Sequence, residues 1–131
     1  MELRKKELKY KGMSLEELQK LEVREFAKFV DSRRRRSLLR NFQATEDFVT
    51  LAKKKIENGK KVRTHIRDIV IVPQLIGMRI AIYNGNEFLP VDVTIEMLGH
   101  KFGEFAPTRT RTKHTKSGVG ATKGSRAKSK K

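Results

Sequence analysis

Charge is distributed along this 131-residue chain in three blocks, and the distribution limits where a folded core can form. Residues 1–60 contain 17 basic and 10 acidic side chains, residues 61–104 contain five of each, and residues 105–131 contain nine basic side chains and no acidic one. A segment of uniform charge repels itself and buries little, whereas a segment of balanced charge can contribute to a core. We therefore expect a folded centre with basic extensions on both sides.

The formal net charge of +16 indicates a polyanionic partner, because a protein this basic repels itself until a polyanion compensates the charge. Nucleic acid is the first candidate, ahead of an anionic membrane surface or an acidic protein. The sequence lacks the ~18-residue apolar stretch of a transmembrane helix and has no apolar run of signal-peptide type near Met1. It contains no cysteine, which excludes disulfides and thiolate metal sites and suits a reducing compartment.

Helical patterns dominate the first half of the chain. Ser14 and Glu17 form a capping-box pattern, and apolar residues at helical spacing then predict a helix over residues 14–30. Thr45 resembles the N-cap of a second helix, because acidic residues follow it directly. Gly59 is typical of the residue that ends such a helix.

Strand patterns replace the helical ones after residue 60. β-branched residues predict strands over residues 62–72, 78–83 and 87–93, and Asn84-Gly85 predicts a type I′ turn between the last two. The predicted fold class is α+β. N-terminal helices would pack on a small antiparallel sheet of about three strands, followed by a disordered basic C-terminal tail.

These patterns divide the chain into four parts. We expect a basic N-terminal arm over residues 1–13, a helical region over 14–60, an α+β core over 61–105 and a basic tail over 106–131. The tail has no apolar periodicity, so nothing in it offsets the entropy cost of folding. We expect it to become ordered only on binding RNA.

The run Arg33–Arg36 is the strongest local basic feature. Four consecutive side chains radiate around a helix, which suits contact with more than one RNA strand, and arginine forms forked contacts with phosphate. A solvated charge run is the alternative interpretation. Tyr83 and Phe88 can stack on bases, although packing across strands is the more common role. The expected RNA-binding residues are Arg33, Arg34, Arg35, Arg36, Arg40, Lys53, Lys54, Lys55, Lys60, Lys61, Arg63, His65, Arg67, Arg79, Asn84, His100, Lys101, Arg109, Arg111, Lys113, Lys116, Lys123 and Arg126.

Histidines are the candidates for metal binding or acid–base catalysis. His65, His100 and His114 are scattered, and no partner lies at metal-ligand spacing, so no metal site is expected. His100 lies four residues before Glu104, but no nucleophile accompanies the pair. A polar loop is therefore the preferred interpretation of this pair.

One ordered series of motifs in the centre of the chain resembles a single known family. The series reads Ile71-Val72-Pro73, Ile76-Gly77, Tyr83-Asn84-Gly85, Phe88-x-Pro90-Val91 and Met97-x-Gly99-His100-x-x-Gly103-Glu104-Phe105. It is similar to the series found in small-subunit ribosomal protein S19. The helical N-terminal region with its arginine run, and the segment Gly118–Thr122, resemble the archaeal and eukaryotic branch of that family.

The resemblance implies a structural protein in the head of the small ribosomal subunit that binds the 3′ major domain of the ribosomal RNA. It implies ribosomal protein S13 as a neighbour, a tail directed toward the decoding region and tRNA, no enzymatic activity, no cofactor, and a place in cytoplasmic ribosomes. A free-standing RNA-binding or ribosome-assembly factor of similar fold is the alternative. An enzyme that acts on RNA through His100 and Glu104 is a third hypothesis.

Overall fold

The computed structural model describes residues 9–110 of the chain. The predicted disorder of the tail, and the expected RNA-binding residues Arg111, Lys113, Lys116, Lys123 and Arg126, lie outside the described residues. Within them the elements are α1 (Leu15–Lys20), α2 (Val23–Phe26), η1 (Ala27–Phe29), α3 (Ser32–Arg40), α4 (Phe42–Glu57), β1 (Val62–Thr64), η2 (Pro73–Leu75), β2 (Arg79–Tyr83), β3 (Phe88–Asp92), η3 (Ile95–Met97) and η4 (Phe102–Phe105), where η marks a 3₁₀-helix.

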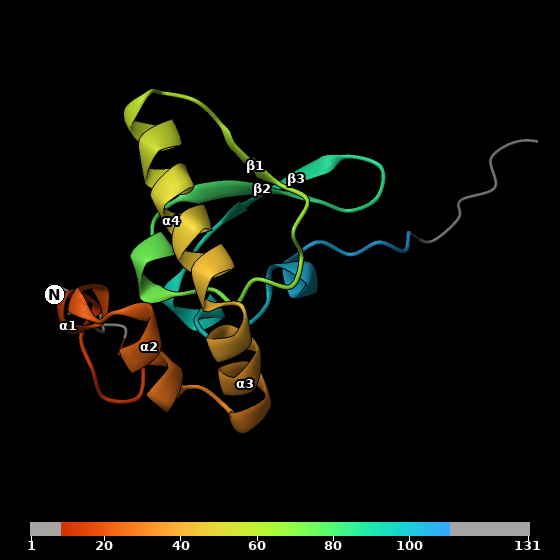
Figure 1. Cartoon of the computed structure of the whole chain (residues 1–131). Helices are drawn as coiled ribbons and strands as arrows, with labels where there is room; N and C mark the ends of the chain where they lie inside the picture. The colour runs from red at the N-terminus through yellow and green to blue at the C-terminus, as the bar shows by residue number, and fades with distance from the viewer. Residues whose placement is uncertain (1–8, 111–131) are drawn as a thin grey trace, which may run out of the picture.

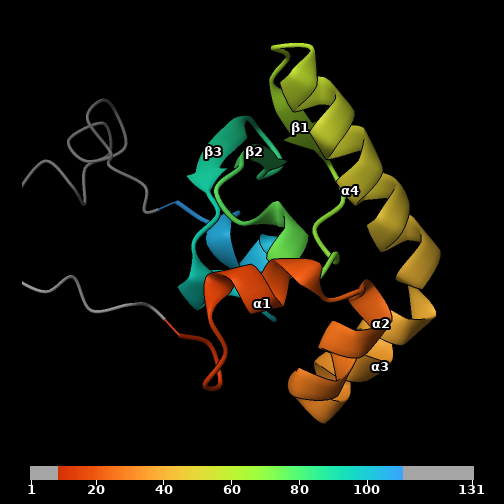
Figure 2. The same ribbon diagram turned by 90° about the vertical axis from the view of Figure 1, so that its left-hand side faces the viewer.

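The predicted α+β class is confirmed. Helix α4 runs along one side of a three-stranded sheet, and α2 and α3 pack near the N-terminal end of α4 (Figures 1 and 2). Buried side chains of α4 and of the sheet, among them Ala52 and Ile80, belong to one hydrophobic core. Phe102 of η4 closes this core, with its ring centroid 5.5 Å from that of Phe48 on α4.

The sheet is mixed, so the predicted antiparallel arrangement is correct for only one of its two strand pairs. β2 lies in the middle, antiparallel to β3 and parallel to β1, and Val62 pairs with Ile80. The predicted strand over residues 62–72 is also too long. β1 ends at Thr64, where the chain leaves the sheet, and Val70 then forms an isolated antiparallel bridge with Lys101, outside the three strands.

The helix predicted over residues 14–30 is interrupted. The capping box at Ser14 is confirmed, because the Ser14 amide donates to the Glu17 carboxylate at 2.9 Å and the Glu17 amide to the Ser14 hydroxyl at 3.4 Å. The chain becomes extended at Leu21, and a new helix begins after Glu22, whose amide donates to the Glu25 carboxylate. The break redirects the chain so that the short helices on either side both bury apolar residues.

Helix α4 ends as expected but begins earlier than expected. Thr45 is not an N-cap, because it is buried inside the helix and its hydroxyl donates to the Asn41 carbonyl at 2.9 Å. At the other end Gly59 has a φ of 65°, and its amide donates to the Ile56 carbonyl while the Lys60 amide reaches back into the last turn. This pair of bonds is a Schellman motif, and it confirms the predicted stop at glycine.

The β2–β3 connection is not the predicted type I′ turn. That turn requires positive φ at two successive residues, but only Gly85 has it, at 101°. The Asn84 side chain instead accepts the amides of Asn86 at 2.9 Å and Glu87 at 2.8 Å, and the Asn84 amide donates to the Glu87 carbonyl. An asparagine side chain therefore organises a longer loop.

Candidate nucleic-acid interface

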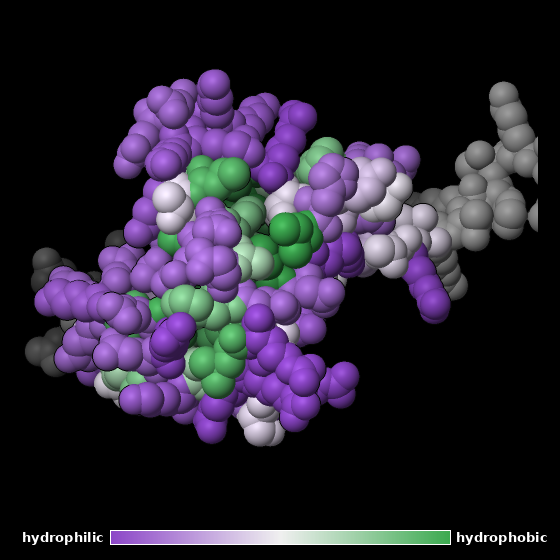
Figure 3. All heavy atoms as spheres, in the orientation of Figure 1, coloured by the Kyte–Doolittle hydropathy of each residue, from purple (hydrophilic) through white to green (hydrophobic). Residues whose placement is uncertain are grey.

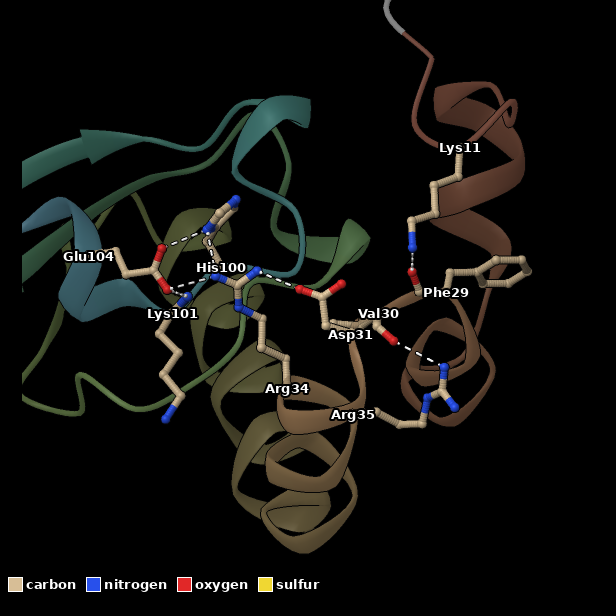
Figure 4. Close-up of polar contacts among 9 residues, drawn as sticks. All are labelled: Lys11, Phe29, Val30, Asp31, Arg34, Arg35, His100, Lys101 and Glu104. Atoms are coloured by element: carbon tan, nitrogen blue, oxygen red, sulfur yellow. Dashed lines mark hydrogen bonds and ion pairs between the residues drawn. The ribbon is translucent and has the colours of Figure 1, made fainter.

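The four arginines at the start of α3 divide into two roles. Arg34 points toward the C-terminal part of the fold, where its guanidinium lies 3.3 Å from a Glu104 oxygen and 3.2 Å from Nδ1 of His100 (Figure 4). It also binds the Asp31 carboxylate at 3.1 Å. Arg34 thus links α3 to residues about 70 positions later in the chain.

Arg35 holds the end of the preceding helical turn. Its guanidinium donates to the carbonyls of Ala27 at 3.0 Å, Lys28 at 3.0 Å and Val30 at 3.1 Å. Carbonyls at the end of a helix lack intrahelical partners, and a cation placed there also complements the helix dipole. Arg35 therefore stabilises the junction between η1 and α3.

The remaining basic side chains of α3 face solvent. Arg33, Arg36 and Arg40 are exposed, and together with Lys101 they line a hollow of about 610 Å³ without any acidic residue in its wall. We call this feature the α3 hollow. Figure 3 shows the strongly hydrophilic colour gathered over this helix. Arginine side chains that keep their forks free are suited to bind phosphate bidentately.

His100 and Glu104 form part of a charge network rather than an isolated acid–base pair. Nδ1 of His100 lies 2.6 Å from a Glu104 oxygen, and Arg34 contacts both side chains. Burial raises the pKa of the Glu104 carboxyl, but hydrogen bonds from His100 and the Lys101 amide, with the charge of Arg34, bring that pKa below its ordinary value. The carboxylate therefore stays ionised at neutral pH and fixes η4 against α3.

Arg67 also has a structural role in the fold. Its guanidinium donates to the carbonyls of Tyr83 at 2.6 Å, Gly103 at 2.9 Å and Ala106 at 2.6 Å. These three carbonyls belong to the end of β2 and to the turn around η4. Arg67 thus connects the hairpin to the last part of the core, and three of its five N–H groups have internal partners.

A second basic group lies at the C-terminal end of α4. Lys53, Lys54, Lys60 and Lys61 are exposed there, and Lys55 is half-buried. Helix α4 has 16 residues and is therefore roughly 24 Å long. Because α3 adjoins its other end, the two basic groups are separated by about the length of this helix (Figure 1).

The sheet carries the other predicted residues of the core. Arg63 and Arg79 are exposed, and His65 lies against two aromatic rings beside the hairpin. Asn84 uses its side-chain oxygen within the loop. Arg109 is exposed at the end of the described segment.

Two polar residues of the α3 hollow are not among the predicted ones. Ser37 and Asn41 line it beside the arginines. Ser37 lies four residues after Arg33, and Asn41 lies four residues after Ser37, so helical spacing places the three on the same side of the chain; this spacing is the signal that could have identified them.

Comparison with known families gives one match. Residues 27–114 match the model of the family described as Ribosomal protein S19. The match covers more than half of the chain, and it includes the α3 hollow and the whole motif series from Ile71 to Phe105. Within residues 9–110, no helix is both long and apolar enough to cross a membrane, and no three metal-ligating side chains of the His, Cys, Asp or Glu type gather.

Proposed function

Because the chain belongs to the ribosomal protein S19 family, we propose that it binds the 3′ major domain of the small-subunit ribosomal RNA, in the head of the subunit. Membership of the family makes it a structural protein of the small subunit that binds ribosomal RNA, and not an enzyme. The proposal adds the place in the subunit, the residues that contact RNA and the neighbours.

The choice of RNA-contacting residues rests on the α3 hollow. Its three free arginines present positive charge, and Lys101 adds a cation from a second segment, where it is also paired with the exposed Asp68 at 3.2 Å. The internal pairing of Arg34 and Arg35 holds the helix beneath them in place. A fixed helix backbone beneath these side chains lowers part of the entropy cost of binding the RNA backbone, and such contacts fix orientation rather than read sequence. The lysines at the far end of α4 would contact a second stretch of backbone roughly 24 Å away.

The basic tail supplies the proposed contacts outside the core. Residues 105–131 carry nine basic side chains and no acidic one, which suits a segment that follows RNA closely. We place it toward the decoding region and tRNA, with ribosomal protein S13 as the protein neighbour, in cytoplasmic ribosomes. An assembly factor of the same fold is the competing function.

Sucrose-gradient sedimentation tests the place in the ribosome. We expect the full chain to sediment with mature small subunits and to remain there after high-salt washing. Recovery only in free fractions at physiological salt would refute the ribosomal assignment. Presence on precursor subunits with release from mature ones would identify an assembly factor instead.

Salt-dependent binding to a transcript of the 3′ major domain tests the α3 hollow. The double variant Arg33→Ala/Arg36→Ala should flatten the slope of log affinity against log salt by about 1.5, since each lost phosphate contact accounts for roughly 0.7–0.9. The control Lys20→Ala/Lys28→Ala removes the same charge from exposed positions on α1 and η1. Equal slopes for the two variants would contradict the assignment of the hollow.

A further inference from the structure

One face of the sheet is left uncovered by the helices of the described segment. Strand register places Arg63 beside Ala81, and Ala81 beside Pro90, on the same face. Tyr83 and Phe88 are paired on this face too, whereas the intervening isoleucines of β2 are buried beneath α4 and the core. We call the surface formed by Arg63, Arg79, Ala81, Tyr83, Phe88 and Pro90 the open sheet face.

A groove of about 790 Å³ lies on this face, within the roughly 300–1,000 Å³ typical of small-ligand sites. Its floor is apolar and includes Met78, Ala81, Phe88 and Pro90. Four cationic residues complete the wall, and no acidic residue lines it; the cations are Lys60, Lys61, Arg63 and Arg79. An apolar floor inside a cationic rim is complementary to a flat, uncharged group attached to an anionic one.

The cations of the rim are largely available to a ligand. Arg79 lies 3.6 Å from the Asp92 carboxylate, in a pair whose side chains are both more than two-thirds exposed. Lys60, Lys61 and Arg63 take part in none of the ion pairs found among residues 9–110. Three positive charges beside the groove therefore have no internal counter-charge in the described part of the chain.

The Phe88 ring lines the groove and packs against two aromatic rings that lie outside its lining. The His65 ring centroid lies 4.5 Å from that of Tyr83 and 5.0 Å from that of Phe88, and the latter two are 5.1 Å apart. The guanidinium of Arg63 lies over the Phe88 ring at 5.4 Å. Mutual packing holds these rings in place, and both aromatic faces and guanidinium planes accept stacked bases.

We propose that the open sheet face binds an unpaired nucleotide of RNA. The base of this nucleotide would lie on the apolar floor against Phe88 and Arg63, and the phosphates on either side of the nucleotide would contact Lys60 and Lys61. A base inside a duplex has both faces stacked on neighbours, so it cannot enter the groove. The inference rests on the proposed function for the choice of RNA as partner, and it adds a site that selects for unpaired residues.

Fluorescence of 2-aminopurine, which is quenched on stacking, tests this site in the full chain. The probes are a 12-nucleotide single-stranded RNA with one central 2-aminopurine and a 12-base-pair RNA duplex. We expect quenching of the single strand. Phe88→Ala should weaken single-strand binding roughly 5- to 100-fold while leaving duplex binding unchanged, since stacking on one ring accounts for a factor of this size.

Two further variants separate stacking from damage to the hairpin. Phe88→Tyr keeps the ring and should keep the quenching. Arg63→Ala changes an exposed side chain on β1 and should also reduce quenching, with an unfolding transition like that of the unmodified chain. If Phe88→Ala and Arg63→Ala both bind the single strand like the unmodified chain, the site is refuted.

Two other outcomes also overturn the inference. Equal affinity for the two RNAs without quenching would mean phosphate attraction alone, and displacement of the single strand by an equimolar polyglutamate peptide would indicate an acidic protein partner. Sedimentation with small subunits reports separately on the proposed function. If the chain sediments with small subunits but does not quench the probe, only the nucleotide site is refuted. If it quenches the probe but does not sediment with small subunits, only the place in the ribosome is refuted.

Discussion

Replacing Arg67 with alanine should destabilise the fold strongly, although the residue belongs to a set expected to bind RNA. The change removes three hydrogen bonds from a cation to backbone carbonyls, at 2.6, 2.9 and 2.6 Å. Such charged bonds contribute a net of about 1.5–3 kcal/mol each. The guanidinium is only half-buried, so water can reach part of the site in the variant. We therefore expect the free energy of unfolding to fall by about 2–4 kcal/mol.

Urea unfolding of the full chain, followed by circular dichroism, measures this loss. Arg63→Ala is the matched control, because the Arg63 side chain is exposed and takes part in none of the side-chain hydrogen bonds found among residues 9–110; its effect should stay within about 0.5 kcal/mol. Arg67→Lys should fall between the two, since an ammonium cannot span all three carbonyls. If Arg67→Ala is no more destabilising than Arg63→Ala, the anchoring role is wrong. A salt slope for RNA binding that drops by about 1 in a folded Arg67→Gln variant, which removes the charge, would show a phosphate contact instead.

Three further changes test local features of the fold. Gly85→Val places a β-branched residue at a φ of 101° and should cost about 1–3 kcal/mol in urea unfolding, so an unchanged midpoint would contradict the loop geometry. Gly99→Ala should cost more than Gly77→Ala, because both have φ near 80° but only at Gly99 would the new Cβ meet the Tyr10 hydroxyl, at 3.3 Å; equal losses would disprove the crowding. The pKa of Glu104 in the folded state lies below its ordinary value of 4.5. The Glu104 carboxylate therefore stabilises the fold fully above pH 4.5, and this contribution disappears as the pH falls through the pKa of the folded state. Glu104→Gln should accordingly reduce stability by about 0.5–1 kcal/mol at pH 7 and by much less at pH 3, and a loss independent of pH would refute the ionic role.

Local signals were sufficient where a structure depends on neighbouring residues. The capping box at Ser14 and the stop at Gly59 depend on bonds within a few positions, and both are present. The N-cap predicted at Thr45 was wrong. A threonine followed by acidic residues resembles an N-cap, but the buried Thr45 hydroxyl donates to the carbonyl four residues earlier, inside the helix. The interruption at Leu21 escapes detection because apolar residues continue at helical spacing across it.

Features that depend on distant residues were not accessible from sequence. Strand direction is one, because the chain between β1 and β2 decides it and no residue pattern within a strand encodes it. The roles of Arg34 and Arg35 are another. These two neighbouring arginines have different roles, because the Arg34 guanidinium contacts Glu104 and the Arg35 guanidinium donates to the carbonyls at the end of η1. Sequence located the basic helix, but only the fold separates its free arginines from its internal ones.

The parallel pairing of β1 with β2 sets an order of events during synthesis. β1 leaves the translating ribosome first, yet among the described residues its partner is β2, which follows only after residues 65–78. β2 and β3 are joined by a short loop and can pair as soon as they emerge, so the later strands form the template on which the earlier one adds. Until Phe102 has emerged, Phe48 on α4 lacks the ring that packs against it in the finished core. A nascent chain that stops short of this residue therefore exposes part of its core, and such products are the ones we expect chaperones and proteases to capture.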